Sequence, residues 1–300
     1  LYGWPVWFAA LALTLRRLPR DADPVFGGLH PLALWGAAAW IGLELYRALE
    51  LAELGSAWSQ GAAMATVAGA LTVVTVRSSK PQWPFGPDRE LYMGPGGTVL
   101  VWALLMLGLL FAGTANGDVS PLPYLPLVHP LDLATLFGFA AALHWFRSCR
   151  RRGHKGAGPD LMPFVPAVIA TFAFLWWNAM LARSVHQMTD ASFTLRELWR
   201  SSDLQVAYSV SWTLIGLGVT VFASRTARRA LWMTGATLLG VVVLKLFAID
   251  LASLGTIAKF GTFLVVGVLL LAVGYLAPVP PSKEGPEEGK DVGATPGGTP

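Results

Sequence analysis

Long blocks of apolar residues restrict the fold of this chain more than any other feature of its sequence. Two of these blocks contain Leu238–Phe247 and Phe263–Leu276. A helix needs about 20 mostly apolar residues to cross a bilayer, and inside the hydrocarbon every backbone N–H and C=O must pair within its own segment. The blocks do not alternate apolar with polar residues, as the strands of a membrane barrel do. The sequence therefore predicts an all-α fold, a polytopic transmembrane helix bundle.

The composition agrees with this prediction, because only 13% of the 300 residues are charged, whereas soluble domains carry about 25%. We predict about nine membrane-spanning helices. Their expected ranges are 2–15, 30–47, 57–76, 96–113, 130–147, 162–183, 204–223, 230–250 and 257–277. The bundle would occupy residues 1–277. Residues 278–300, rich in Pro, Gly, Glu and Lys, have no apolar face to bury and are expected to form a disordered tail.

Local motifs predict further details of the bundle. The chain begins Leu-Tyr-Gly-Trp, without Met or a charged segment before its first apolar block, so we expect a missing N-terminal region of a longer protein. Thr194-x-x-Glu197 and Ser202-x-x-Gln205 have the spacing of capping boxes, the first for a short interfacial helix and the second for the seventh span. Gly61, Ala65 and Gly69 recur every four residues, a spacing that lets two helices approach closely.

Positive charge is distributed unevenly among the expected loops. Those after the first, third, fifth and seventh spans hold 14 Lys and Arg, and those after the second, fourth, sixth and eighth hold 5. Because cytoplasmic loops carry an excess of these residues, we expect the first set and the C-terminus in the cytoplasm, and the second set outside a bacterial inner membrane. The net charge of +4 lies mainly in short loops between apolar blocks, which favours the lipid bilayer over nucleic acid as the partner.

Ionisable and amide groups at membrane depth are costly, and they mark functional sites or paired structural layers. Nearly all such groups here fall near the outer ends of the expected spans. The candidate residues of this polar layer are Glu44, Arg47, His129, Asp132, Asn178, Arg183, His186, Lys245, Asp250 and Lys259. They could form ion pairs, line a pocket, or reach separately to the headgroups. A layer predicts an acid–base pair between helices, with Asp132 or Asp250 as the acid and Arg183, Lys245 or Lys259 as the base.

The segment Ser120–Pro130 contains four prolines and neither Lys nor Arg. Because proline blocks helix continuation, we expect this segment to be extended, to lie on the outer surface and to bring His129 and Asp132 to the polar layer. Alternatively, it is only a rigid connector. Gly-rich phosphate loops, His-Glu-x-x-His, Cys-x-x-Cys and Gly-x-Ser-x-Gly do not occur in the sequence. Cys149 is the single cysteine, and the five histidines lack metal-ligand spacing, so we expect neither a metal nor a cofactor.

Several segments resemble one bacterial family. They are His30-Pro31, Leu125–Leu133, Phe174–Asn178 running on to Arg183 and His186, Leu238–Leu251 with its Lys245 and Asp250, and Gly274–Pro281. Together they resemble the family named domain of unknown function 2339, multi-pass membrane proteins whose members are often longer and have no established activity. The resemblance covers most of 30–281 and singles out Asp132, Asn178, Arg183, Lys245 and Asp250. It assigns them no role.

Two positions depart from the family pattern. His129 stands where the family usually has Asn, and Lys259-Phe-Gly-Thr-Phe263 stands where it usually has Arg-Ile-x-Ser-Phe. Lys259 keeps the charge but cannot make the two-pronged contact of an arginine.

Three functions stay open at this point. We favour a non-enzymatic membrane protein whose outward-facing polar layer binds or passes a small solute, an ion or a lipid headgroup. Alternatively, an envelope enzyme could act on lipid-linked substrates at the periplasmic face, with Asp132 or Glu44 as the base. The third possibility is a structural subunit that binds other membrane subunits.

Overall fold

The computed structural model describes residues 3–17, 28–85, 88–153, 162–189 and 192–250, and beyond them only residues 267, 268, 271 and 275. These residues divide into two compact units, one ending at Leu204 and the other beginning at Gln205. The predicted last span, 257–277, lies outside the described residues except at those isolated positions, and the predicted tail lies wholly outside them. Throughout the described part the regular structure is helical, as the apolar blocks predict.

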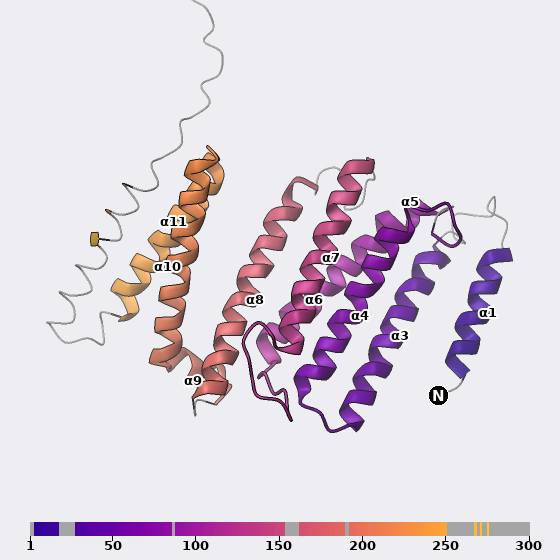
Figure 1. Ribbon diagram of the computed structural model, residues 1–300, viewed down its shortest axis with the longest axis horizontal. Coiled ribbons are helices and arrows are strands. Elements are labelled where there is room, and N and C mark those ends of the chain that lie inside the picture. Colours follow the sequence, from indigo (N-terminus) through magenta and orange to yellow (C-terminus); the bar gives the residue numbers. More distant parts are fainter. Residues whose placement is uncertain are drawn as a thin grey trace, which may run out of the picture. The chain divides into compact units, whose positions relative to one another are not determined.

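The first unit consists of long helices joined by short turns and irregular segments. Its elements are α1 (Gly3–Arg17), α3 (Leu29–Leu51), α4 (Ser56–Arg77), α5 (Arg89–Leu91), η1 (Tyr92–Gly96), α6 (Gly97–Thr114), α7 (Pro130–Arg152), η2 (Met162–Phe164), α8 (Val165–Met188) and α9 (Leu195–Arg200). In Figure 1, α3, α4, α6, α7 and α8 run alternately down and up, so that the α3–α4 and α6–α7 connections lie at the same end.

Except for the last, each predicted span coincides with a helix in the structure. Within the described residues, five segments are long and apolar enough to cross a membrane. They are Ser56–Arg77, Arg89–Thr114, Val165–Met188, Ser202–Arg225 and Arg229–Ala248. Helices α3 and α7 have 23 residues each but include charged side chains, among them Glu44 in α3 and Asp132 in α7. The polytopic membrane bundle is therefore confirmed as the fold class.

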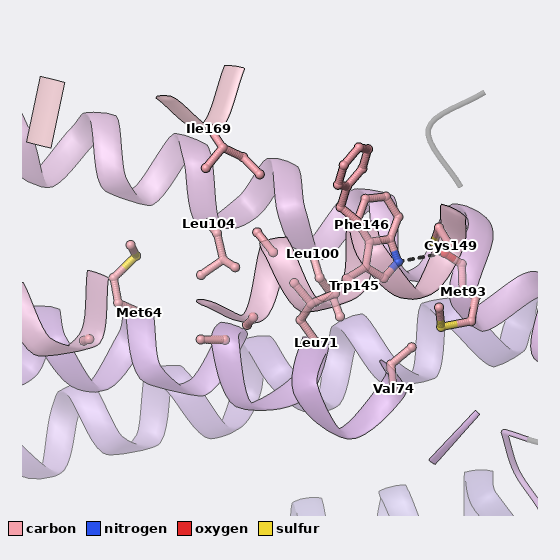
Figure 2. Packing of buried hydrophobic residues seen from close by; sticks show 14 of the residues in the cluster. Met64, Leu71, Val74, Met93, Leu100, Leu104, Trp145, Phe146, Cys149 and Ile169 are labelled. Atoms are coloured by element: carbon pink, nitrogen blue, oxygen red, sulfur yellow. Dashed lines mark hydrogen bonds between the residues drawn. The ribbon is translucent and has the colours of Figure 1, made fainter. Parts of the chain in front are cut away.

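The core of the first unit lies where α4, η1, α6 and α7 meet. Figure 2 shows Leu71 of α4, Met93 of η1 and Leu100 of α6 packed near Trp145 of α7. The Trp145 indole N–H donates to the Met93 carbonyl at 2.9 Å. A methyl group at Gly97 would overlap with Trp145 Nε1. Glycine is therefore required at this position, because any larger residue would push the indole away from its acceptor.

The π-helical turn η1 leads into α6 and contains Pro95. Proline has no N–H to donate and its ring clashes with the preceding turn, which agrees with the irregular geometry here. Indole groups from neighbouring helices donate to carbonyls of this turn. Trp145 donates to Met93 O, and Trp35 donates to Gly96 O at 3.1 Å. The membrane-length segment begins at Arg89, before the predicted start at residue 96.

The predicted small-residue face of α4 packs closely at Gly61 but not along its whole length. A methyl group at Gly61 would lie 3.0 Å from the Pro130 carbonyl of α7, whereas one at Gly69 would meet no atom of the described residues within 4 Å. The prediction is therefore wrong for Gly69. Spacing identifies which residues share a helix face, but it does not show how far along that face the neighbouring helix continues.

The second unit contains most of α10 (Ser202–Arg225), α11 (Arg229–Lys245) and the π-helical turn η3 (Leu246–Asp250). Helices α10 and α11 approach closely at two glycines. A methyl group at Gly235 would lie 2.5 Å from Thr220 Oγ1, and one at Gly216 would lie 2.8 Å from Leu239 Cγ. Small residues at such crossings let membrane helices gain van der Waals contact.

One of the two predicted N-caps is confirmed. Thr194 accepts a hydrogen bond from the Glu197 amide at 3.4 Å and caps α9, while the Glu197 carboxylate accepts from the Ser192 amide at 3.1 Å. At the start of α10, Ser201 accepts from the Leu204 amide at 3.3 Å. The predicted cap at Ser202 is therefore wrong by one residue, because Ser202 is already inside the helix.

Candidate functional site

The candidate site centres on an ion pair between Asp132, in the first turn of α7, and Arg183, in the C-terminal half of α8. Arg183 Nη2 donates to Asp132 Oδ1 at 2.6 Å, and the two side chains are 1% and 0% exposed, respectively. Burying two charges is tolerated only when they are paired and hydrogen bonded. This pair is the acid–base contact between helices that the polar layer predicted.

Trp176 also donates a hydrogen bond to the carboxylate. Its indole N–H donates to the same Oδ1 of Asp132 at 2.9 Å. The sequence analysis did not single out Trp176. Trp176 precedes Arg183 by about two helical turns, which places both residues on one face of α8. That spacing was the available signal.

The segment 115–129 joins α6 to α7 and brings His129 to the pair. His129 is buried, and its Nε2 lies 3.2 Å from the Gly117 carbonyl oxygen. Since a carbonyl can only accept, Nε2 carries the proton, which leaves Nδ1 as an acceptor. Burial lowers the pKa of His129 below its ordinary value of 6.5; Asp132 opposes this shift and Arg183 adds to it. The imidazole is therefore neutral in the folded protein.

Tyr124 and Gly117 fit the segment against α8. The Tyr124 ring lies tilted against the His129 ring with 5.1 Å between centroids, and its hydroxyl lies 3.3 Å from Ser184 Oγ. Gly117 has a φ of +86°, and a methyl group there would lie 3.1 Å from Tyr124 and 3.5 Å from Arg183 Cβ. Both the backbone conformation and the space favour glycine. Sequence reasoning singled out neither residue.

Backbone carbonyls of the same segment cap the start of α4. Ala57 N donates to Asp118 O at 2.9 Å, and Gly55 N donates to Ser120 O at 3.0 Å. The Trp58 indole donates to Val119 O at 3.2 Å. The first amides of a helix have no partner within the helix, so these contacts hold the segment firmly in place. The stretch preceding Pro130 is non-helical, as its prolines predict.

Three polar atoms of the cluster are buried and have no hydrogen-bond partner among the described residues. They are His129 Nδ1, Asp132 Oδ2 and Arg183 Nε. Buried polar atoms in proteins are nearly always hydrogen bonded. The cluster therefore offers two acceptors and one donor to a further polar group.

An apolar groove of about 640 Å³ adjoins this cluster. It is bounded by the end of α3, the first turns of α4, the segment 115–129 and the first turns of α7. Its lining residues are Leu49, Trp58, Gly61, Ala62, Ala65, Val119, Leu122, Pro123, Leu125, Val128, His129, Pro130, Leu133 and Ala134. His129 thus belongs both to the groove and to the polar cluster.

The other predicted residues of the first unit lie on α3 and α8. Glu44 is half-buried and Arg47 is exposed on α3. Asn178 donates to Phe174 O within its own helix at 2.7 Å, and the His186 ring lies 5.3 Å from the Phe193 ring.

In the second unit, Lys245 donates to Gln205 O at 3.2 Å and to Ser209 Oγ at 2.8 Å, which links α11 to α10. The Asp250 side chain and all of Lys259 lie outside the described residues. Within the described part, no group of three or more His, Cys, Asp or Glu could hold a metal ion.

Comparison with known proteins identifies the family. A family model described as "Predicted membrane protein (DUF2339)" matches residues 1–280. No curated protein and no solved structure matches the chain. The family match covers most of the chain and agrees with its membrane-length helices. The chain belongs to the DUF2339 family of predicted membrane proteins.

Proposed function

We propose that this protein is a multi-pass protein of the bacterial inner membrane that binds a lipid of the outer leaflet in the groove beside His129. The observation that carries the proposal is the groove itself, about 640 Å³ of mainly apolar lining next to a buried polar cluster. This volume falls within the roughly 300–1,000 Å³ of ligand pockets. The loop-charge bias of 14 to 5 supports the outward orientation and a cytoplasmic C-terminus.

The segment over the groove supports a lipid as the ligand. Leu122, Leu125 and Val128 line the groove, yet they are 55%, 56% and 63% exposed. Exposed apolar clusters are rare on surfaces that face water, but they are stable where they meet the acyl region of a bilayer. A hydrocarbon chain can therefore enter the groove from the surrounding leaflet without crossing water.

Hydrocarbon contact alone gives such a site little affinity, because lipid tails are as apolar as the groove. The polar end of the groove must then supply most of the preference for one lipid over another. His129, buried at this end, is the side chain placed to do so.

The enzymatic alternative receives less support. Arg183 and Trp176 both occupy Oδ1 of Asp132, whose side chain is 0% exposed. A general base must reach the proton that it removes, and Asp132, unlike His129, does not line the groove. Glu44 is half-buried on α3 and does not line the groove. If no lipid binds, we would infer that the protein is a structural subunit that binds other membrane subunits.

Photocrosslinking tests the proposal. Purified protein would be incubated with a phospholipid that carries a photoreactive acyl chain, and the labelled peptides would be identified by mass spectrometry. We expect labels on α4 and on residues 119–134. Ala62→Trp fills the groove and should reduce this labelling strongly. Val73→Trp, at an exposed position of the same helix, should not.

Equal labelling of wild type and Ala62→Trp, or labels spread evenly over all exposed apolar positions, would contradict lipid binding in the groove. The Val73→Trp control excludes a general effect of adding an indole to α4.

A further inference from the structure

We propose that the bound lipid carries N–H or O–H donors in its headgroup, next to a phosphate, and that His129 accepts a hydrogen bond from them. This inference rests on the proposed lipid site and names the chemical class of its ligand. It starts from the tautomer of His129. Because Nε2 donates to Gly117 O at 3.2 Å, the neutral ring presents Nδ1 only as an acceptor.

The atoms without a hydrogen-bond partner in the described part of the chain set the pattern that the headgroup must match. Nδ1 of His129 and Oδ2 of Asp132 accept, and Nε of Arg183 donates. A headgroup with donors satisfies the two acceptors, and a phosphate oxygen satisfies the guanidinium. A quaternary ammonium headgroup has no N–H and can satisfy only Arg183.

Because these atoms are buried, the affinity for a lipid depends on how well its headgroup completes their hydrogen bonds. Each has an exposed area near zero, so a headgroup reaches them only when side chains at the polar end of the groove move aside. A headgroup that enters without completing these hydrogen bonds leaves buried polar atoms unpaired. An unpaired buried atom costs more binding free energy than an atom at the surface, where water can take the place of the missing partner.

Lipids with identical acyl chains provide the test. The protein in detergent would be titrated with dioleoyl phosphatidylethanolamine, phosphatidylglycerol and phosphatidylcholine, and binding would be followed by native mass spectrometry. The first two carry ammonium and hydroxyl donors, respectively, and the third carries none. We expect at least one donor lipid to bind about tenfold or more tightly than phosphatidylcholine. Preference for the first identifies ammonium, and preference for the second identifies hydroxyl.

Variants of His129 test whether this residue causes the preference for lipids with donor headgroups. His129→Asn keeps an amide donor and an acceptor and should retain it, whereas His129→Leu should bind all three lipids alike. Equal binding of the three lipids to wild type would overturn the donor assignment and leave the lipid site intact. If no lipid binds, or if Ala62→Trp leaves binding unchanged, the lipid site itself is wrong. The wild-type comparison holds even if His129→Leu fails to fold.

Discussion

Arg183 on α8 donates from Nη2 to Oδ1 of Asp132 on α7 across 2.6 Å, and neither side chain is more than 1% exposed. The same oxygen accepts from the Trp176 indole, so one carboxylate connects two positions of α8 to the start of α7. A buried pair adds little net stability over an apolar pair of similar shape, but breaking it leaves an uncompensated charge. Removal of one partner is therefore the informative experiment.

Asp132→Asn should lower the free energy of unfolding by roughly 3–5 kcal/mol, because Arg183 would stay buried without a counter-charge. Arg183→Met in the same chain should restore part of this loss. Thermal unfolding in detergent measures both effects. Glu44→Gln, at a half-buried position away from the pair, should change stability by about 0.5 kcal/mol or less. A double variant no more stable than Asp132→Asn alone would contradict a coupled pair.

Trp176 and Trp177 form a matched pair of neighbours for testing the indole contact. Trp176→Phe removes the hydrogen bond to Asp132 and should destabilise the protein by about 1–3 kcal/mol. Trp177 Nε1 is buried without a hydrogen-bond partner among the described residues, so Trp177→Phe should be near neutral. Equal losses in the two variants would mean that packing, rather than the hydrogen bond, sets the contribution of Trp176.

Gly235 is the position at which close packing between α10 and α11 can be tested. Gly235→Ala places a methyl group 2.5 Å from Thr220 Oγ1 and should lower stability by about 1–3 kcal/mol through overpacking. Gly240→Ala, on the same helix with no atom of the described residues within 4 Å, should instead raise stability by up to about 1 kcal/mol through helix propensity. The measurement is the melting temperature of each variant, and we expect that of Gly235→Ala to be the lower. The reverse order would exclude a tight crossing of α10 and α11 at Gly235.

The stability of the fold should depend on pH through His129. Burial holds the pKa of its imidazole below 6.5 in the folded protein, whereas the unfolded chain has the ordinary value. Below pH 6.5 the unfolded chain takes up a proton that the folded protein does not. The contribution of neutral His129 is therefore complete above pH 6.5 and decreases as the pH falls through the ordinary value toward the folded one.

Melting temperatures of wild type and His129→Asn measured between about pH 7.5 and pH 5.5 would isolate this contribution. The wild-type curve should fall more steeply on the acid side, because asparagine does not titrate. Parallel curves would assign the acid sensitivity to other groups.

The helices could be predicted from the apolar blocks, because a span is defined by its own length and composition. Their ends were less predictable. α8 continues to Met188, past the predicted end at residue 183, so Arg183 lies inside the helix and can face Asp132. The segment that begins at Arg89 opens with an irregular turn whose carbonyls accept hydrogen bonds from Trp35 and Trp145. Composition does not reveal such partners, which are distant in sequence.

The sequence predicted which residues lie at the depth of the polar layer, but not which of them contact one another. Depth placed His129, Asp132 and Arg183 together correctly, because each lies near the same end of its helix. Depth also included Glu44 and Arg47, which the structure places on α3 away from the pair. Equal depth does not fix the angle around each helix axis. Tyr124 and Gly117 were missed because they act through an irregular segment, where no periodicity links sequence to direction.

The first turn of α4 depends on a segment that follows it by about 60 residues. Gly55 and Ala57 donate their amides to Ser120 and Asp118, instead of to a capping side chain of their own helix. Solvent exchange at these two amides therefore requires the segment over the groove to detach, and the two events share one opening free energy. Hydrogen exchange at Gly55 and Ala57 would measure how often the groove opens, and a lipid seated beneath the segment should slow it.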